Sequence, residues 1–136
     1  LRGQGANPNE AQELFKTSLD DLIREAKFET NVQIYRKIIA ISINTDTDNT
    51  QQDRIAAAKV ADKLLTVHGV RASFAVCVIG NYIRISARST GKINVQKILE
   101  TLGGGGHYDS AATQMNCTVE EAIASLKEAV DMYLDS

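Results

Sequence analysis

Apolar and polar residues follow two different spacings along this chain of 136 residues, and the first of them predicts β-strands. Segments 37–44 and 72–79 are rich in β-branched and other apolar residues, which is typical of buried strands. Segment 82–88 alternates apolar and polar residues, so one of its faces should be buried and the other polar. Gly80 and Asn81 lie between the last two segments and favour the tight turn of a β-hairpin.

The second spacing places apolar residues three and four positions apart, which predicts amphipathic helices. Two short helices are expected within residues 8–26, with Thr17 or Ser18 capping the second. Residues able to cap three further helices precede later apolar stripes: Thr50 with Asp53, Asn94, and Thr118 with Glu121. One more strand is predicted near 111–116, so strands and helices alternate. The sequence therefore predicts an α/β fold, a mixed β-sheet flanked by helices.

The composition is that of one ordinary globular domain. Hydrophobic residues make up 43% of the chain, which excludes disorder. The chain has nine Gly and one Pro, too few for a collagen-like repeat. The longest apolar run, residues 74–79, is too short to span a membrane. Cys77 and Cys117 lack the CxxC spacing of a redox or zinc motif and are expected to be reduced thiols. Because the chain begins with Leu1 rather than Met, we expect it to be a segment of a longer protein.

The charge distribution points to one local anion site. From His68 to Leu99 the chain carries five Lys or Arg and no Asp or Glu, although its overall formal charge is −2. The remaining residues therefore carry −7, which argues against a general nucleic-acid binder, since such a domain is usually basic throughout. A basic stretch confined to one region favours a local anion site instead, and a merely solvated basic face is the alternative.

Four consecutive glycines, Gly103, Gly104, Gly105 and Gly106, followed by His107 form the most informative segment. One glycine is enough to end a helix, and each further glycine costs conformational entropy, so we expect a ligand to approach this backbone closely. Successive N–H groups in such a loop can surround a phosphate or carboxylate, to which His107 can donate a further hydrogen bond. Tight packing or a flexible connection between helix and strand is the structural alternative. The sequence patterns of known phosphate loops do not match.

A second candidate lies at the end of segment 82–88. Arg88 stands on the polar face of this predicted strand, where a guanidinium can hold two phosphate oxygens at once. Ser89 adds a hydroxyl group, and Ser86 lies on the same face as Arg88. An ordinary strand end with a solvated arginine is the alternative.

The sequence contains no recognisable catalytic motif. His68 lies in a Val-His-Gly turn and is expected to be structural. The spacing of Asp46 and Asp48 lacks the glycine and glutamate that a calcium loop requires. No set of His, Cys, Asp or Glu has the spacing of metal ligands, and no nucleophile motif is present. If the chain belongs to an enzyme, we expect it to hold only part of the active site.

Taken together, several segments resemble a known family. Residues 85–89, 91–95, 103–107 and 111–114 are similar to the DHHA1 domain of the DHH/DHHA1 phosphoesterase superfamily. The resemblance is closest to the C-terminal domain of the membrane-anchored GGDEF/DHH-DHHA1 phosphodiesterases that hydrolyse cyclic di-AMP. Where the wider superfamily has Ala-Ala-Gly after the glycines, this chain has Ala-Ala-Thr-Gln, as in that narrower branch.

The resemblance implies a division of labour between two domains. An upstream DHH domain, absent from this chain, would hold two Mn²⁺ ions that activate water, and residues 1–30 would be its tail or a helical linker. Residues 31–136 would form the DHHA1 domain, which binds the nucleotide but has no catalytic residue or metal ligand and is inactive by itself. The substrate-binding residues expected on this basis are Arg88, Ser89, Gly103, Gly104, Gly105, Gly106 and His107, together with Ser86 and Asn94.

The same resemblance implies the ligand and the setting. The expected ligand is cyclic di-AMP or a linear adenine dinucleotide, bound by a cytoplasmic domain without direct membrane contact. The parent protein would be anchored in the bacterial cell membrane and act in signalling, and a homodimer is left open. Three alternatives also remain open: a phosphatase of short oligoribonucleotides or phosphoadenosine phosphate, a non-catalytic nucleic-acid-binding module, and an interaction or dimerisation domain.

Overall fold

The computed structural model describes residues 8–136, with side chains from residue 19 onward. Within this range the strands are β1 (Val32–Tyr35), β2 (Ile39–Asn44), β3 (Ala72–Ile79), β4 (Tyr82–Ser89), β5 (Gly105–His107) and β6 (Ser110–Met115). The helices are α1 (Pro8–Glu29), α2 (Thr50–Leu64), α3 (Val95–Glu100) and α4 (Val119–Leu134). None of these helices is long and apolar enough to span a lipid bilayer.

The strands form one mixed sheet, as the sequence predicts. Their order is β1-β2-β3-β4-β6-β5, with β2 parallel to β3 and every other neighbouring pair antiparallel. The crossover through α2 joins the two parallel strands, because a tight turn can join only antiparallel neighbours. This crossover packs α2 against one face of β3 and β4, although α2 is distant from β4 in the sequence.

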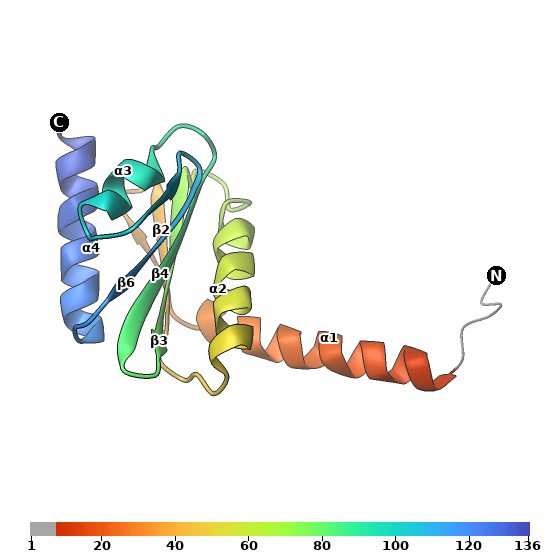
Figure 1. Ribbon diagram of the computed structural model, residues 1–136. Coiled ribbons are helices and arrows are strands. Elements are labelled where there is room, and N and C mark those ends of the chain that lie inside the picture. Colours follow the sequence, from red (N-terminus) through yellow and green to blue (C-terminus); the bar gives the residue numbers. More distant parts are fainter. Residues whose placement is uncertain (1–7) are drawn as a thin grey trace.

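Helices cover both faces of the sheet, with α2 on one face and α3 and α4 on the other (Figure 1). A hydrophobic core lies on each face of the sheet. β3 contributes side chains to both cores, because successive side chains of a strand point to opposite faces. Phe74 and Val76 belong to the core beneath α3 and α4, whereas Ala75 and Cys77 belong to the core beneath α2. This alternation confirms that residues 72–79 form a central strand buried on both sides.

A single helix replaces the two short N-terminal helices that the sequence predicts. α1 runs without interruption from Pro8 to Glu29 and projects away from the sheet (Figure 1). Neither Gly nor another Pro follows Pro8 within this segment, so nothing in the backbone forces a break at Thr17 or Ser18. The prediction of two helices is therefore wrong.

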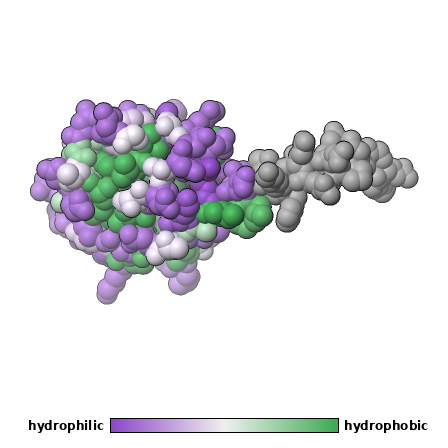
Figure 2. All heavy atoms as spheres, turned by 90° about the horizontal axis from the view of Figure 1, so that it is seen from below, coloured by the Kyte–Doolittle hydropathy of each residue, from purple (hydrophilic) through white to green (hydrophobic). Residues whose placement is uncertain are grey.

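Three apolar residues of α1 are exposed to solvent. Leu22 is 58% exposed, with Leu19 and Ile23 beside it, and Figure 2 shows hydrophobic surface where the described side chains of α1 begin. At the C-terminal end of α1, Phe28 is fully buried in the core beneath α2. The role of residues 1–30 as a linker or domain tail stays a prediction, and residues 1–7 lie outside the described range.

The sequence pattern does not predict β1 or β5. β1 pairs with β2 through a turn in which Arg36 and Lys37 adopt positive φ angles of 53° and 71°. Such turns usually contain Gly, Asn or Asp, so the sequence carries no hairpin signal here, and the strand predicted over 37–44 begins only at Ile39. β5 consists of two glycines and His107, and glycine is depleted in strands.

The cap of α2 lies one residue earlier than predicted. Asn49 is the N-cap, and its side-chain oxygen accepts a hydrogen bond from the backbone N–H of Gln52. Asp53 is 1% exposed, and its carboxylate accepts hydrogen bonds from the backbone N–H groups of Asp48 and Asn49, each at 2.9 Å. The predicted capping box of Thr50 and Asp53 is wrong, because the Asp53 carboxylate reaches back beyond Thr50 to the preceding loop.

Asp53 also holds α1 against α2. The guanidinium of Arg24 in α1 donates to Asp48 and, at 2.9 Å, to Asp53. These hydrogen bonds, to Asp48 and then to Asp53, raise the pKa of Arg24, and the Arg24 hydrogen bond lowers the pKa of Asp48. Two helices and the loop before α2 thus converge on one buried carboxylate.

The other two predicted caps are confirmed. The Asn94 side chain accepts a hydrogen bond from the backbone N–H of Lys97 at the start of α3, at 3.1 Å. Thr118 and Glu121 form a reciprocal capping box on α4, with distances of 2.9 and 3.1 Å. Both signals depend on residues within one helical turn, and such local signals can be recognised in the sequence.

Both cysteines are free, as expected. Burial within β3 raises the pKa of the Cys77 thiol to about 12, so this thiol stays protonated at neutral pH. Cys77 is therefore a core residue rather than a reactive group.

Asp53→Ala should lower the free energy of unfolding by about 2–4 kcal/mol, because it leaves Arg24 and two backbone N–H groups without their buried acceptor. Asp46→Ala is the matched control: its side chain is 78% exposed and pairs with Lys27 at 3.4 Å. That substitution should change stability by about 0.5 kcal/mol or less. Urea unfolding measures both variants, and equal stabilities would contradict the central role of Asp53.

Candidate functional site

One face of β4, β6 and β5 carries most of the predicted site residues. Residues directly opposite each other in antiparallel strands point to the same face, so the register aligns side chains in rows across the three strands. The rows are Arg88, Ser110 and His107; Ser86, Ala112 and Gly105; and Arg84 and Gln114. These eight residues are called the β4–β6–β5 face below.

The β4–β6–β5 face lies on the α2 side of the sheet. Ile83 and Ile85 alternate with Arg84 and Ser86 along β4, and the two isoleucines point into the core beneath α3 and α4. The face is closed at β4, where Ser86 is 2% exposed, and open at β5, where His107 is exposed. A ligand can therefore reach the face from the β5 edge of the sheet.

The glycine run forms a helix end followed by an edge strand, and its contact with an anion stays a prediction. α3 closes in a Schellman motif, in which the N–H groups of Gly103 and Gly104 donate to the carbonyls of Glu100 and Leu99, at 3.1 and 2.8 Å. Gly103 adopts a φ of +85°, which glycine reaches without strain. The chain then enters β5 at Gly105.

Close packing on β6 explains two more of the glycines. A Cβ at Gly104 would lie 2.4 Å from the carbonyl oxygen of Ala112, and a Cβ at Gly106 would lie 2.6 Å from the Cα of Ala111. Any other residue at either position would force β5 and β6 apart. The structural alternative therefore accounts for Gly104 and Gly106 without a ligand.

Gly105 has no such structural reason. Its φ is not positive, and a Cβ added to it would meet no atom within 4 Å. It stands opposite Ala112 in the row of small residues on the β4–β6–β5 face. The open space in front of Gly105 is the space that a ligand on this face would occupy.

Arg88 is oriented by an ion pair with α2. Its Nε donates to the carboxylate of Asp62 at 3.0 Å, and its Nη1 donates to the carbonyl of Ala87 at 2.9 Å. The Asp62 side chain is 66% exposed, so this is a surface pair that contributes little to stability. The pair directs the Nε of Arg88 toward α2, and the Arg88 side chain is 20% exposed.

Ser89 and Asn94 have structural roles. The Ser89 hydroxyl oxygen accepts hydrogen bonds from the N–H groups of Gly91 and Ile93, at 3.0 and 3.2 Å, and Ser89 is 7% exposed. Asn94 caps α3. Both side chains fix the turn between β4 and α3, and their contact with a substrate stays a prediction.

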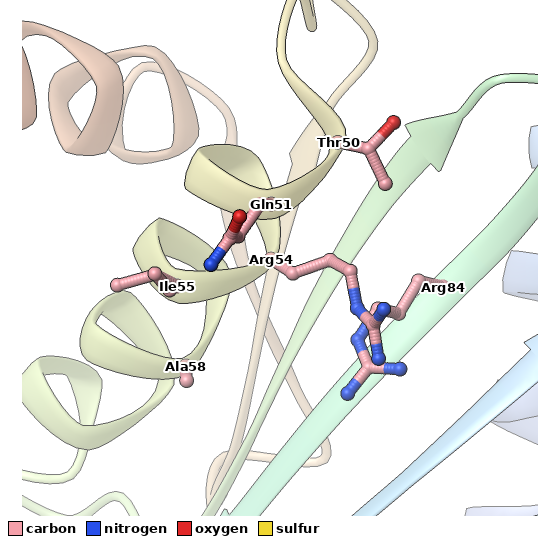
Figure 3. Close-up of a pocket in the computed structure, with 6 residues that line it drawn as sticks. All are labelled: Thr50, Gln51, Arg54, Ile55, Ala58 and Arg84. Atoms are coloured by element: carbon pink, nitrogen blue, oxygen red, sulfur yellow. The ribbon is translucent and has the colours of Figure 1, made fainter.

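The structure also brings together two arginines to which the sequence analysis gave no role. Arg84 stands on the polar face of β4, and the crossover through α2 places Arg54 beside it (Figure 3). They belong to a pocket of about 600 Å³ that is lined by Thr50, Gln51, Arg54, Ile55, Ala58 and Arg84. The alternation along residues 82–88 is a signal for Arg84, but no local pattern connects it with Arg54.

The part of the chain that the structure describes offers no metal site. Within it, no three side chains of His, Cys, Asp or Glu lie close enough together to hold an ion. The groups that can meet a ligand on the β4–β6–β5 face are guanidinium, imidazole, hydroxyl and amide groups. Their chemistry suits the binding of an anion.

Comparison with known proteins assigns the family. Residues 35–136 match the DHHA1 domain. The chain belongs to the DHHA1 family. This DHHA1 domain is 39% identical over 137 residues to the cyclic-di-AMP phosphodiesterase GdpP of Bacillus subtilis, which covers 99% of this chain and 21% of that protein. The domain spans about a fifth of the length of the curated relatives it matches.

Solved structures confirm the predicted DHHA1 fold. An exopolyphosphatase-related protein from Bacteroides fragilis matches with a TM-score of 0.73 and 22% identity, over 83% of this chain and 34% of the other. A pGpG-specific phosphodiesterase from Vibrio cholerae matches with a TM-score of 0.62 and 14% identity, over 97% and 44%. At these identities the likeness shows the fold alone.

Gly104, just before β5, and Gly105, its first residue, should respond in opposite ways to alanine. Gly104→Ala should lower the free energy of unfolding by about 1–3 kcal/mol, because its Cβ would overlap the β6 backbone. Gly105→Ala should leave stability unchanged or raise it by up to about 1 kcal/mol, because its Cβ meets open space and the unfolded chain loses freedom. Thermal unfolding of both variants measures the difference. Equal losses of stability would show that Gly105 is also required by packing.

Proposed function

We propose that this DHHA1 domain binds the substrate of a cyclic-di-AMP phosphodiesterase on its β4–β6–β5 face, while an upstream DHH domain carries out hydrolysis. The identity of 39% to GdpP across nearly the whole chain supports this branch over phosphatases of short oligoribonucleotides. The net charge of −2 argues against a nucleic-acid-binding module, which would rely on many phosphate contacts.

The observation that carries the proposal is the open space in front of Gly105. Gly105, Ala112 and Ser86 form a row whose side chains have at most two heavy atoms. A flat group such as a nucleobase can lie on the open part of this row, at Gly105 and Ala112, whereas Ser86 is buried. Since Gly105 is not required by packing or by its backbone angles, a ligand gives this glycine a physical reason.

The neighbouring row supplies the groups that would meet a phosphate. Arg88 and His107 are two strands apart, so their backbones are separated by about 10 Å, and a phosphate above Ser110 lies within reach of both side chains. A guanidinium can donate two parallel hydrogen bonds to a phosphate, and an imidazole N–H can donate a third. β5 is an edge strand of the described sheet, so N–H groups on its outer side can also donate.

Hydrolysis itself would depend on the upstream domain. Two Mn²⁺ ions held there would supply the activated water. The described residues have no cluster that fits these ions, so the part of this chain is to bind and orient the dinucleotide. In this arrangement the chain is a cytoplasmic domain of a membrane-anchored bacterial signalling enzyme.

Arg88→Lys should weaken the binding of a linear adenine dinucleotide by roughly ten- to a hundredfold, because a lysine cannot donate two parallel hydrogen bonds in one plane. Asp62→Asn should tighten binding, because it removes the carboxylate that competes for Arg88. Arg36→Lys is the matched control, since Arg36 pairs with Asp131 and Asp135 instead. Calorimetry on the 136-residue chain measures all three. Unchanged affinity in Arg88→Lys would mean that Arg88 is merely a solvated strand end.

Gly105→Ala should abolish or strongly weaken dinucleotide binding without lowering the melting temperature, because the added methyl group occupies the space of the ligand. His107→Ala should follow the same pattern, since His107 is exposed and contributes little to the core. Affinity and melting temperature are measured side by side on both variants. The proposal fails if Gly105→Ala binds the dinucleotide as tightly as the unmodified chain does.

A further inference from the structure

We propose that Arg54 and Arg84 form a second phosphate subsite, which holds the other phosphate of the dinucleotide that lies on the β4–β6–β5 face. The inference rests on the proposed function for the identity of the ligand. The geometry of the pocket carries the rest.

The two guanidinium groups converge from different elements. Arg54 extends from the first turns of α2 and Arg84 from the middle of β4, and their side chains point toward one another (Figure 3). Their pocket has a volume of about 600 Å³, within the range of small-molecule sites. Thr50 and Gln51, at the N-terminal end of α2, add polar groups to its wall.

Neither arginine is neutralised by the part of the chain that the structure describes. Arg24, Arg36 and Arg88 each pair with aspartate, whereas no described carboxylate lies within ion-pair distance of Arg54 or Arg84. The Nε of Arg84 is shielded from solvent and has no hydrogen-bond partner among these residues. A buried donor without an acceptor costs free energy, and an anion in the pocket would remove that cost.

The like charges of the two arginines are also electrostatically unfavourable to each other. Burial, and then the charge of Arg54, lower the pKa of Arg84. Keeping both guanidinium groups charged side by side is therefore unfavourable for folding. A phosphate between them would turn this repulsion into two charge-assisted interactions.

The position of the pocket separates it from the site at Arg88. Arg84 and Arg88 lie on the same face of β4 and four residues apart, so their backbones are separated by about 14 Å. Arg88 pairs with Asp62 near the C-terminal end of α2, whereas Arg84 points toward Arg54 near its N-terminal end, so the two guanidinium groups lie toward different ends of the face. The row of Ser86, Ala112 and Gly105 lies between them, and its open part, at Ala112 and Gly105, would lie between the two phosphate positions.

The test compares Arg54→Gln and Arg84→Gln with Arg71→Gln, which removes an exposed arginine outside the pocket. Calorimetry on the 136-residue chain uses two probes, a linear adenine dinucleotide and inorganic phosphate. Each pocket variant should weaken dinucleotide binding by roughly tenfold or more, and Arg71→Gln should leave it unchanged. Arg84→Gln should also melt at the same temperature as the unmodified chain or higher, because the shielded Nε donor without a partner and a half-buried charge are gone.

Unchanged dinucleotide affinity in both pocket variants would overturn the inference, even if inorganic phosphate no longer binds. If Arg84→Gln melts lower, the decision falls to Arg54→Gln, whose side chain is exposed on α2. If the dinucleotide needs Arg88 and Gly105 but not Arg54 or Arg84, the proposed function stands and this subsite is wrong. If only inorganic phosphate binds, and Arg54→Gln abolishes that binding, the pocket is a phosphate site and the proposed function is wrong.

Discussion

The close approach of the glycine run to β6 is the contact on which the candidate site depends. At Gly104 and Gly106 any Cβ would come within 2.4 to 2.6 Å of the β6 backbone, so β5 can pair with β6 only because both side chains are missing. This pairing sets Gly105 opposite Ala112. A shift of the β5–β6 register by one residue would turn Gly105 and His107 to the other face of the sheet. Two glycines that serve packing thus position the one glycine that is free to meet a ligand.

Helix α2 places charged side chains on the side of the sheet that carries the β4–β6–β5 face. Its Asp53 accepts hydrogen bonds from Arg24 and from the preceding loop. Near the C-terminal end of the helix, its Asp62 pairs with Arg88. Between them Arg54 faces Arg84, with no described carboxylate within ion-pair distance of either. Because local rules of stability are usually broken at functional sites, the unpaired arginines mark the part of the face that folding alone does not explain.

Local signals made much of the fold predictable. β3, β4, their hairpin and the capping box of α4 each depend on residues close together in the sequence, and all are found in the structure. The errors have both distant and local causes. Asp53 leaves the predicted capping box for the loop and Arg24, and the turn at Arg36 and Lys37 has positive φ angles without the residues that usually announce them.

The sequence by itself determined the DHHA1 family, the mixed α/β sheet, and the segments around Arg88 and the glycine run, since their motifs are continuous stretches of chain. Only the tertiary structure decided that Gly105 alone lacks a structural reason, that Arg88 pairs with Asp62, and that Arg54 meets Arg84. Each of these outcomes depends on the register of β5 and β6 or on the packing of α2 against β4. Such contacts join segments that are far apart in the chain, and no spacing of residues along the sequence records them.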